Sequence, residues 1–418
     1  MWRIEERYIQ AVKIGGGRTA GMDEQDEQYW RRNLAVCLVG SFTTIVAMTL
    51  LLPFLPLYIA ELGVTAPAAI AQWSGVAFGA TFFAAASIAP FWGWMADRYG
   101  RKLMLVRASL GMAIVQSLMG MAHNVLELVG LRLFAGFAGG YASGATILVA
   151  TQTPRHRSGW ALGMLNSGIM AGSLVGPLIG GTLPPLIGIR NTFLLAGGAI
   201  FLTFLATTFL IKEEKRSAST KKAAAAARWS QIPDKRPVIA MLAVGTLLTF
   251  ANMSIEPIIT LYVGQLVEAS RITFVSGLTM SAAALGAILS AARLGKLADR
   301  IGHWPVVIIT VAISAALLIP QAFVTAGWQL VALRFLMGLS LGGLMPCVTS
   351  IIRLSVPDAV AGRVLGYATS STYFGQVAGP ILGGFVGGHI GMRAVFLGTA
   401  ILMALGAAYA WLAQPDRA

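Results

Sequence analysis

Charged residues are scarce in this sequence. Asp, Glu, Lys and Arg make up 11% of the 418 residues, whereas 56% are hydrophobic. Soluble domains typically contain about 25% charged residues. Many apolar runs exceed the ~18 residues that suggest a membrane-spanning helix. The composition therefore excludes an ordinary soluble domain and predicts an all-α polytopic membrane protein.

Cysteine and histidine are also rare. The two cysteines, Cys37 and Cys347, lie in apolar runs without C-x-x-C spacing, and the four histidines are scattered. This pattern predicts neither a disulfide framework nor a metal site. The sequence also lacks a nucleotide-binding loop and a nucleophile constellation. We therefore expect no enzymatic activity, no cofactor and no nucleic-acid partner.

The apolar residues form twelve runs, six on each side of a charged segment. We expect a cytoplasmic tail over 1–33, a six-helix bundle over 34–211, a cytoplasmic linker over 212–237, a second six-helix bundle over 238–413 and a cytoplasmic tail over 414–418. The linker contains KKAAAAAR, which predicts a short surface helix. The expected spans are 34–59, 71–95, 103–122, 126–150, 160–186, 191–211, 238–263, 272–292, 305–325, 328–352, 363–387 and 393–413.

The basic residues predict the orientation of these spans. Nearly all of the 31 lysines and arginines lie in the tails, the linker and the connections on the same side as these. Only Arg190, Arg271 and Arg393 lie in connections on the opposite side. Because lysine and arginine accumulate in cytoplasmic loops, we expect both termini in the cytoplasm. The net charge of +14 thus indicates topology, with attraction to anionic lipid as a minor addition.

One glycine pattern occurs twice. Glycines on one stripe of an apolar helix allow a second helix to approach closely in lipid, and a Gly-Pro pair removes a backbone donor and bends the helix. A single Gly-xxx-Gly would indicate ordinary packing, but GMLNSGIMAGSLVGPLIGG returns 203 residues later as GYATSSTYFGQVAGPILGG. The two copies predict a duplicated chain with a bent, closely packed helix in each half. In the first copy the fixed positions are Gly163, Gly172, Gly176, Pro177, Gly180 and Gly181.

Other segments match between the two halves. GWMADRYGRK (93–102) aligns with GKLADRIGHW (295–304), and GLRLFAGFAGG (130–140) aligns with ALRFLMGLSLGG (332–343). Parallel repeats that place a site near the bilayer midplane are a known transporter plan. The repeats therefore predict a transporter built from two related halves.

These residues resemble the major facilitator superfamily, and the resemblance covers nearly the whole chain. The connection between the second and third spans carries that family's G-x-x-x-D-R-x-G-R-K signature in full. In the second half Asp299 and Arg300 remain, but His303 and Trp304 replace the basic pair. In the first half the signature residues are Gly93, Asp97, Arg98, Gly100, Arg101 and Lys102.

The glycine stripe resembles the antiporter motif of this superfamily's drug exporters, which its uptake members generally lack. PFLPLYIAELGV and TQTPRHRSGWALG are similar to bacterial multidrug exporters of the drug:proton antiporter group. The resemblance implies a central cavity surrounded by spans 1, 4, 7 and 10. It also implies that the halves rock between inward and outward openings.

The resemblance makes Asp97 a conformational gate. Its carboxylate would hold the inner side closed by pairing with Arg101 and with the positive end of a helix from the other half. Asp299 and Arg300 would form a weaker second gate, because their partner positions have changed. Alternatively, both connections only set the topology.

Three charged residues lie inside apolar runs. Arg132 and Arg334 lie roughly 10 Å deep by rise per residue, where a charge usually faces a cavity or a partner; each could instead snorkel to the interface. Glu256 lies about 27 Å along its span, and the following Pro257 suggests a helix break. We predict that Glu256 responds to protons and that the arginines bias it. The alternative is a wetted residue at a helix end.

Several residues combine apolar surface with a polar group and could line the cavity. On membrane helices such residues equally serve as packing or interface anchors. The candidates are Tyr58, Phe137, Tyr141, Tyr262, Met345 and Tyr373.

The sequence leaves three functions open. The antiporter motif favours a proton-driven exporter of amphiphilic small molecules in a bacterial inner membrane, acting as a monomer. A proton-coupled importer of a sugar or organic acid would need a polar cavity, and the spans are poor in Asn and Gln. A transporter-like sensor would need an extra domain. Two arginines against one glutamate leave the charge of the substrate undecided.

Overall fold

The computed structural model describes residues 29–154, 156–213 and 234–414, and every regular element in these ranges is helical. Eleven spans in this part of the chain are long and apolar enough to cross a membrane. The prediction of an all-α polytopic protein is thereby confirmed. The N-terminal tail up to residue 28, the alanine-rich part of the linker and residues 415–418 lie outside the described residues.

The helices follow one another with short connections. They are the first helix, Tyr29–Thr49, then α2 (Leu55–Glu61), α3 (Pro67–Tyr99), α4 (Arg101–Met119), α5 (Val125–Ala138), α6 (Tyr141–Gln152), α7 (Ser158–Ile187), α8 (Ile189–Leu210), α9 (Arg236–Val263), η2 (Ala269–Arg271), α10 (Ile272–Ile301), α11 (His303–Gln321), α12 (Gly327–Leu341), α13 (Leu344–Leu354), α14 (Asp358–His389) and α15 (Met392–Ala413).

The helix α14 is 32 residues long but is not among the eleven apolar spans. Its sequence ATSSTYFGQVAGPILGG mixes apolar residues with glycines, hydroxyls and Gln376. These residues lower the mean hydropathy of a helix that packs against α9 and α3. Eleven of the twelve expected spans are therefore clear from apolar character alone.

Single glycines with positive φ lie between consecutive helices at equivalent places in the two halves. Gly100 and Gly302 both have φ of 95°, and Gly188 and Gly391 have φ of 84° and 125°. A β-carbon would be strained in this conformation. We call the end of the molecule with Gly100 and Gly302 the inner end, and the end with Gly188 and Gly391 the outer end.

These tight turns correct the expected helix bounds. The predicted spans 71–95 and 272–292 end too early, because α3 continues to Tyr99 and α10 continues to Ile301. Charged residues lower the hydropathy of the last two turns without disfavouring a helix. Asp97 and Asp299 therefore lie on helices, directly before the glycine turns.

The positions of helix breaks were predicted less well. The predicted break at Glu256 is wrong, since α9 continues through Pro257. Proline removes one backbone donor, and within a membrane bundle neighbouring groups can satisfy the freed carbonyl. The breaks instead separate α5 from α6 at Gly139–Gly140, α12 from α13 at Gly342–Gly343, and the first helix from α2.

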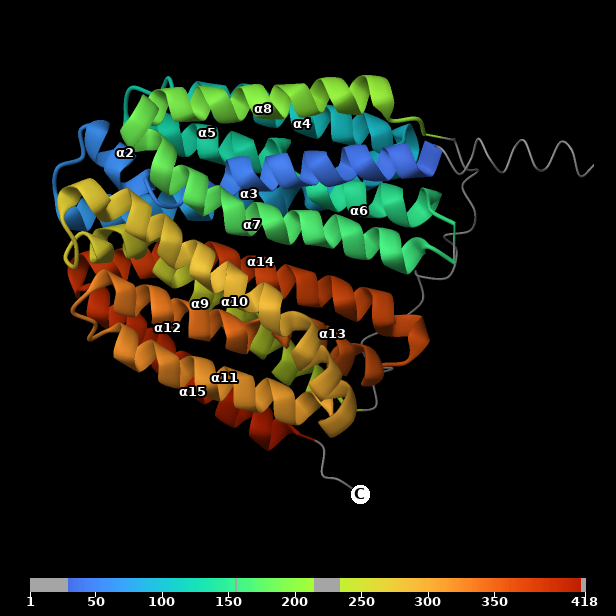
Figure 1. Ribbon diagram of the computed structural model, residues 1–418. Helices are drawn as coiled ribbons and strands as arrows, with labels where there is room; N and C mark the ends of the chain where they lie inside the picture. Colours follow the sequence, from blue (N-terminus) through green and yellow to red (C-terminus); the bar gives the residue numbers. More distant parts are fainter. Residues whose placement is uncertain (1–28, 155, 214–233, 415–418) are drawn as a thin grey trace, which may run out of the picture.

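The two halves of the chain occupy separate parts of the molecule (Figure 1). The first half, residues 29–213, runs from blue to green and lies above the second half, residues 234–414, which runs from yellow to red. Each half has a matching core contact. The ring centroids of Tyr58 and Phe193 lie 5.3 Å apart, and those of Tyr262 and Phe396 lie 5.1 Å apart. The duplication seen in the sequence thus extends to packing.

Candidate transport site

Two pairs of helices join the halves at the outer end, α3 with α14 and α7 with α10. A β-carbon on Gly75 would overlap the carbonyl oxygen of Pro380, and one on Gly277 would overlap that of Pro177. The backbones therefore touch directly, as small residues allow in a membrane.

Two hydrogen bonds also cross between the halves. Ser281 Oγ donates to the Leu174 carbonyl at 2.7 Å, and Thr260 Oγ1 donates to the Pro53 carbonyl at 3.0 Å. Both lie in the outer part of their helices. Together with the glycine contacts they close the outer end.

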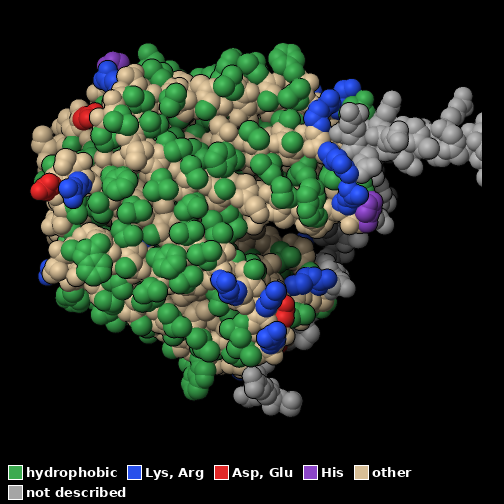
Figure 2. Space-filling view, viewed as in Figure 1, with side chains coloured by type: hydrophobic (Ala, Val, Ile, Leu, Met, Phe, Trp, Pro, Cys, Tyr) green, Lys and Arg blue, Asp and Glu red, His purple; other side chains and the backbone are tan. Residues whose placement is uncertain are grey.

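The inner parts of the same helices are open. A β-carbon on Gly93, Gly163, Gly295 or Gly366 would have no atom of the described chain within 4 Å. Figure 2 shows a hollow between the two halves, near the end where lysines and arginines gather. The structure is therefore open toward the inner end.

Within the first half, the predicted glycine stripe packs on the first helix. A β-carbon on Gly180 would overlap the Leu50 carbonyl, and one on Gly176 would overlap Thr49 Oγ1. Gly172 faces the Phe42 carbonyl, 2.9 Å from the position of its β-carbon. In the second half Gly375, Gly379 and Gly383 face α9 in the same way.

The last glycine of each copy faces the other way. A β-carbon on Gly181 would lie 2.7 Å from the Thr273 carbonyl, and one on Gly384 would overlap the Ala71 carbonyl, both in the opposite half. The adjacent glycines thus serve two surfaces, one inside a half and one between halves. The close approach expected from the sequence is present, while the role of the stripe in antiport stays a prediction.

One carboxylate and two guanidinium groups lie close enough to interact inside the molecule. Glu256 on α9 interacts electrostatically with Arg334 on α12 and, more weakly, with Arg132 on α5. The two arginines are only 2% and 6% exposed. Arg132 belongs to the first half and the other two residues to the second. The sequence predicted that these three residues lie near one another. The group spans the boundary between the two halves, which a rocking motion of the halves would change.

The two arginines differ in their partners. Arg132 Nε donates to the Ala77 carbonyl at 3.2 Å, and its guanidinium lies 5.0 Å from the ring centroid of Phe78. Arg334 Nε and Nη2 have no hydrogen-bond partner among the described residues. A buried donor without a partner is costly. Arg334 is therefore the group most sensitive to a change of charge on Glu256.

At the inner end, Asp97 Oδ1 lies 3.2 Å from Arg101 Nη2, which is the predicted pair. Glu213, directly after α8, adds a contact that the sequence analysis missed. Its two carboxylate oxygens accept from the backbone N–H groups of Arg101 and Lys102, both at 2.8 Å. The negative charge thus lies at the positive end of α4. No sequence pattern links Glu213 to residues more than a hundred positions away.

The second gate region is plainer. Asp299 and Arg300 are exposed on the last turn of α10. Among the described residues, which end at 414, no side chain accepts from the backbone N–H groups of the first turn of α11. The weaker gate expected there stays a prediction.

Three of the six predicted cavity residues have packing roles. Tyr58, Tyr141 and Tyr262 are at most 2% exposed. Their hydroxyls bond within their own halves, to the Met119 carbonyl at 2.6 Å, to Thr207 Oγ1 at 2.9 Å and to the Gln321 carbonyl at 2.9 Å.

The other three predicted cavity residues keep some accessible surface. Phe137 and Tyr373 are half-buried, and Met345 is 37% exposed. Phe137, Met345 and Tyr373 therefore remain the cavity candidates. The three buried tyrosines are better explained as packing anchors.

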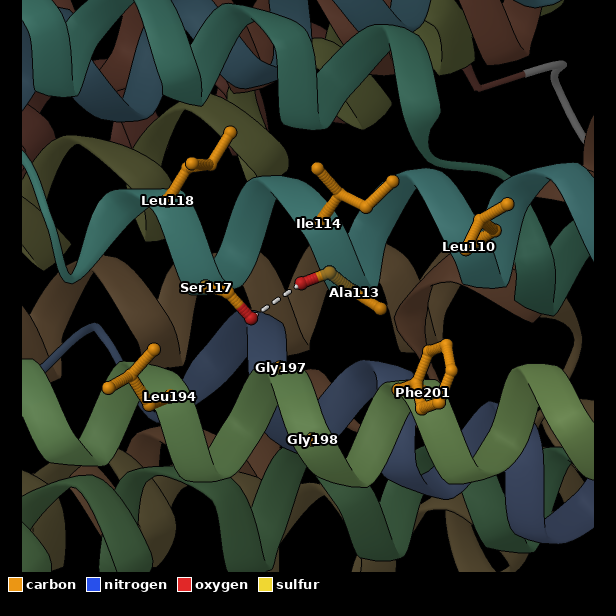
Figure 3. A pocket seen from close by; sticks show the side chains of 9 residues that line it. All are labelled: Leu110, Ala113, Ile114, Ser117, Leu118, Leu194, Gly197, Gly198 and Phe201. Carbon is orange, nitrogen blue, oxygen red and sulfur yellow. Dashed lines mark hydrogen bonds between the residues drawn. The ribbon is translucent and has the colours of Figure 1, made fainter.

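An apolar hollow of about 440 Å³ lies elsewhere, between α4 and α8 (Figure 3). Ser117, its hydroxyl-bearing residue, donates to the Ala113 carbonyl at 2.9 Å. The surrounding Ile114, Leu194 and Phe201 are 45–52% exposed on the outside of the bundle. Such a surface suits lipid chains and contains none of the predicted site residues. Among the described residues no group of three His, Cys, Asp or Glu could hold a metal.

Known proteins resemble this chain over most of its length. The multidrug resistance protein MdtG of Salmonella typhimurium (strain LT2) is 43% identical over 384 residues, which are 91% of this chain and 95% of that protein. The MdtG of Salmonella newport (strain SL254) gives the same values.

Solved structures share the fold. The D-xylose-proton symporter has a TM-score of 0.76 at 15% identity, covering 93% of this chain and 98% of that one. A bacterial homologue of the human lysosomal transporter Spinster, in an inward-facing and unoccupied conformation, has a TM-score of 0.75 at 14% identity, covering 92% and 97%.

The family assignment follows from sequence. Residues 37–327 and 273–418 match the model of the Major Facilitator Superfamily. Given this match and relatives that are 43% identical over 91% of its length, the protein belongs to the Major Facilitator Superfamily.

Proposed function

We propose that this protein exports amphiphilic small molecules across the bacterial inner membrane in exchange for protons. Twelve spans in two six-helix bundles, with both termini cytoplasmic, would alternate between inward and outward openings. The similarity to multidrug resistance proteins and the antiporter-like glycine stripe support export. We further infer a monomer that acts without a cofactor and is not an enzyme.

The observation that carries this proposal is the position of Glu256. Ionised, it attracts Arg334 in its own half and Arg132 in the other half. Protonated, it loses both attractions, so the relative energies of the two openings change. A proton bound at this carboxylate would thereby favour one opening and its release the other.

The helix register supports the predicted gate. Gly75 on α3 contacts Pro380 on α14. An equal step inward along both helices leads from Gly75 to Asp97 and from Pro380 to Asp358, the first residue of α14. If the inner ends approach each other, the Asp97 carboxylate meets the positive N-terminal end of α14. That contact would hold the inner side closed.

The same register describes the second gate. Gly277 on α10 contacts Pro177 on α7. A step of 22 residues inward leads to Asp299 on α10, and a slightly shorter step of 19 residues along α7 leads to its first residue, Ser158. The two gates are thus close to equivalent in position, and His303 and Trp304 stand where the first gate has Arg101 and Lys102.

The inner cleft would receive the substrate. On α7 the face that contacts the other half at the outer end continues inward, at 3.6 residues per turn, to Met170 and Asn166. The equivalent face of α14 continues inward to Tyr373 and Thr369. Asn166 and Thr369 are exposed. We assign these positions, with Phe137 and Met345, to an apolar cavity that offers few hydrogen-bonding groups.

The experiment that tests export is a susceptibility panel. A strain expressing the protein is compared with an empty-vector strain against cationic, neutral and anionic toxic amphiphiles, with and without a proton uncoupler. We expect increased resistance to several compounds and its loss with the uncoupler. Increased sensitivity would indicate uptake instead, and no change with any compound would argue against multidrug export.

A further inference from the structure

The fourth span of the first half contains a true break. Gly139 is extended, with φ of −60° and ψ of −172°, and Gly140 is left-handed, with φ of 103°. The carbonyl groups at the end of α5 therefore lose their helical partners. In a membrane such groups must be satisfied by other donors.

Arg107 on α4 supplies these donors. Its Nη1 donates to the Phe137 carbonyl at 3.0 Å and its Nη2 to the Gly139 carbonyl at 2.9 Å. The guanidinium also lies 3.7 Å from the ring centroid of Trp92 on α3. The indole Nε1 of Trp92 donates to the same Phe137 carbonyl at 2.9 Å. Two neighbouring helices are thus fastened to the break.

The corresponding place in the second half is different. There Gly342 and Gly343 keep nearly helical angles, with φ, ψ of −61°, −30° and −98°, 0°. The gate-loop alignment places Leu294 at the position of Trp92 and Ile309 at that of Arg107. No side chain among the described residues donates to the carbonyls of residues 339–343. This break is therefore milder and is not fastened.

We infer that Arg107 is a positioning residue that fixes the bend between α5 and α6. If the protein alternates as proposed above, the first half then moves as one body with Arg132 held in place, and bending falls on the unfastened α12–α13 junction. Arginine suits this role because it stays charged and presents a planar fork of donors. Without the fork, the Gly139 carbonyl would lose its donor and the Phe137 carbonyl would keep only Trp92, which would drive the segment toward the straighter geometry of its counterpart.

A simpler role for Arg107 is to mark the cytoplasmic side, as its place near the inner end of α4 suggests. A snorkelling arginine would direct its guanidinium to water. Arg107 instead bonds two carbonyls of another helix, and its Nε is buried. The charge alone does not explain this geometry.

The test measures the bend directly. Spin labels at Leu126 on α5 and Ile147 on α6, which are 67% and 41% exposed, report one junction. Labels at Trp328 on α12 and Leu354 on α13, which are 71% and 77% exposed, report the other. In Arg107→Met we expect the α5–α6 distance distribution to broaden or shift, while the α12–α13 distribution stays as in the unsubstituted protein.

Arg107→Lys is the matched control, since it keeps the charge for insertion but loses the fork. We expect it to broaden the α5–α6 distribution less than Arg107→Met does. In transport, Arg107→Met should lower the maximal rate about tenfold with KM changed less than about twofold, because a conformational step is affected. An unchanged α5–α6 distribution in Arg107→Met, or one in Arg107→Lys identical to that of the unsubstituted protein, would overturn the inference. The distances need neither substrate nor pH gradient, so they decide it even if export fails.

Discussion

The first and second halves pack alike but differ in their charged contacts. In both, three glycines bring the fifth helix of the half onto the backbone of its first helix, and a glycine with positive φ forms the turn directly after the helix that carries the gate aspartate. Gly180 on Leu50 and Gly383 on Ser254 are equivalent contacts.

The charged contacts differ among the described residues. Glu213 caps α4 and Arg107 fastens the α5–α6 break, whereas the described part of the second half, 234–414, has no side-chain cap at α11 and no donor at the α12–α13 junction. Conversely, Glu256 lies in the second half, where the first has Leu52. The backbone contacts that assemble the fold are thus alike in the two halves, whereas the charged contacts of the described residues differ.

The largest effect on transport and stability is expected at the glycine contacts, which are the same in the two halves. Gly176→Val and its counterpart Gly379→Val should each abolish transport and lower stability, because the side chain would collide with the neighbouring helix. Overpacking of a tight contact typically costs about 1–3 kcal/mol. Unfolding of the purified protein in detergent, together with transport in vesicles, measures both effects.

Gly198→Val is the control for these variants. Gly198 lies in an apolar helix and has no described atom within 4 Å of its β-carbon position. We expect near-normal stability and transport. If Gly176→Val were equally mild, the stripe would not be a packing surface.

A smaller effect on transport is expected at the gates, and it should differ between Asp97 and Asp299. Asp97→Asn should shift the protein toward the inward-open form and lower transport about tenfold, which lies within the usual range of about 5- to 150-fold for coupling energies. Asp299→Asn should lower it less, since its basic neighbours are missing. A membrane-impermeant maleimide reacting with Thr369→Cys from the cytoplasmic side reports the opening. Equal effects of both substitutions would remove the distinction between the gates.

The smallest effect concerns the cap on α4. Glu213→Ala should weaken the first turn of this helix by about 1 kcal/mol, as loss of other capping side chains does. Hydrogen exchange of the Arg101 and Lys102 amides should then speed up, while exchange at the start of α11 stays constant. Unchanged exchange at both places would show that the Glu213 contact does not stabilise the first turn of α4.

The sequence predicted what depends on regular patterns. The apolar runs and the repeated glycines follow regular patterns or recur between halves, and Asp97 and Arg101 are close in sequence, so the helices, the close helix packing and the Asp97–Arg101 pair were predictable. The grouping of Glu256 with Arg132 and Arg334 was inferred from their depth in the membrane and from the family's arrangement.

What the sequence did not predict depends on contacts between distant segments or on local backbone geometry. Arg107 resembled one more cytoplasmic arginine, because its carbonyl partners are exposed only after α5 breaks. Pro257 suggested a break that neighbouring helices prevent. Tyr58 and Tyr262 could have been cavity residues or packing anchors, and the hydrogen bonds of their hydroxyls within their own halves favour packing.

Proton coupling through Glu256 is tested most directly by drug movement driven by a pH gradient. Vesicles containing purified protein are loaded with the compound to which expression gives the greatest resistance, and transport is followed over a range of imposed gradients. The unsubstituted protein should respond to the gradient. Glu256→Gln should still bind the compound but transport it at a rate independent of the gradient. A Glu256→Gln protein with the rate and pH dependence of the unsubstituted one would contradict the account, and the proton would have to bind elsewhere.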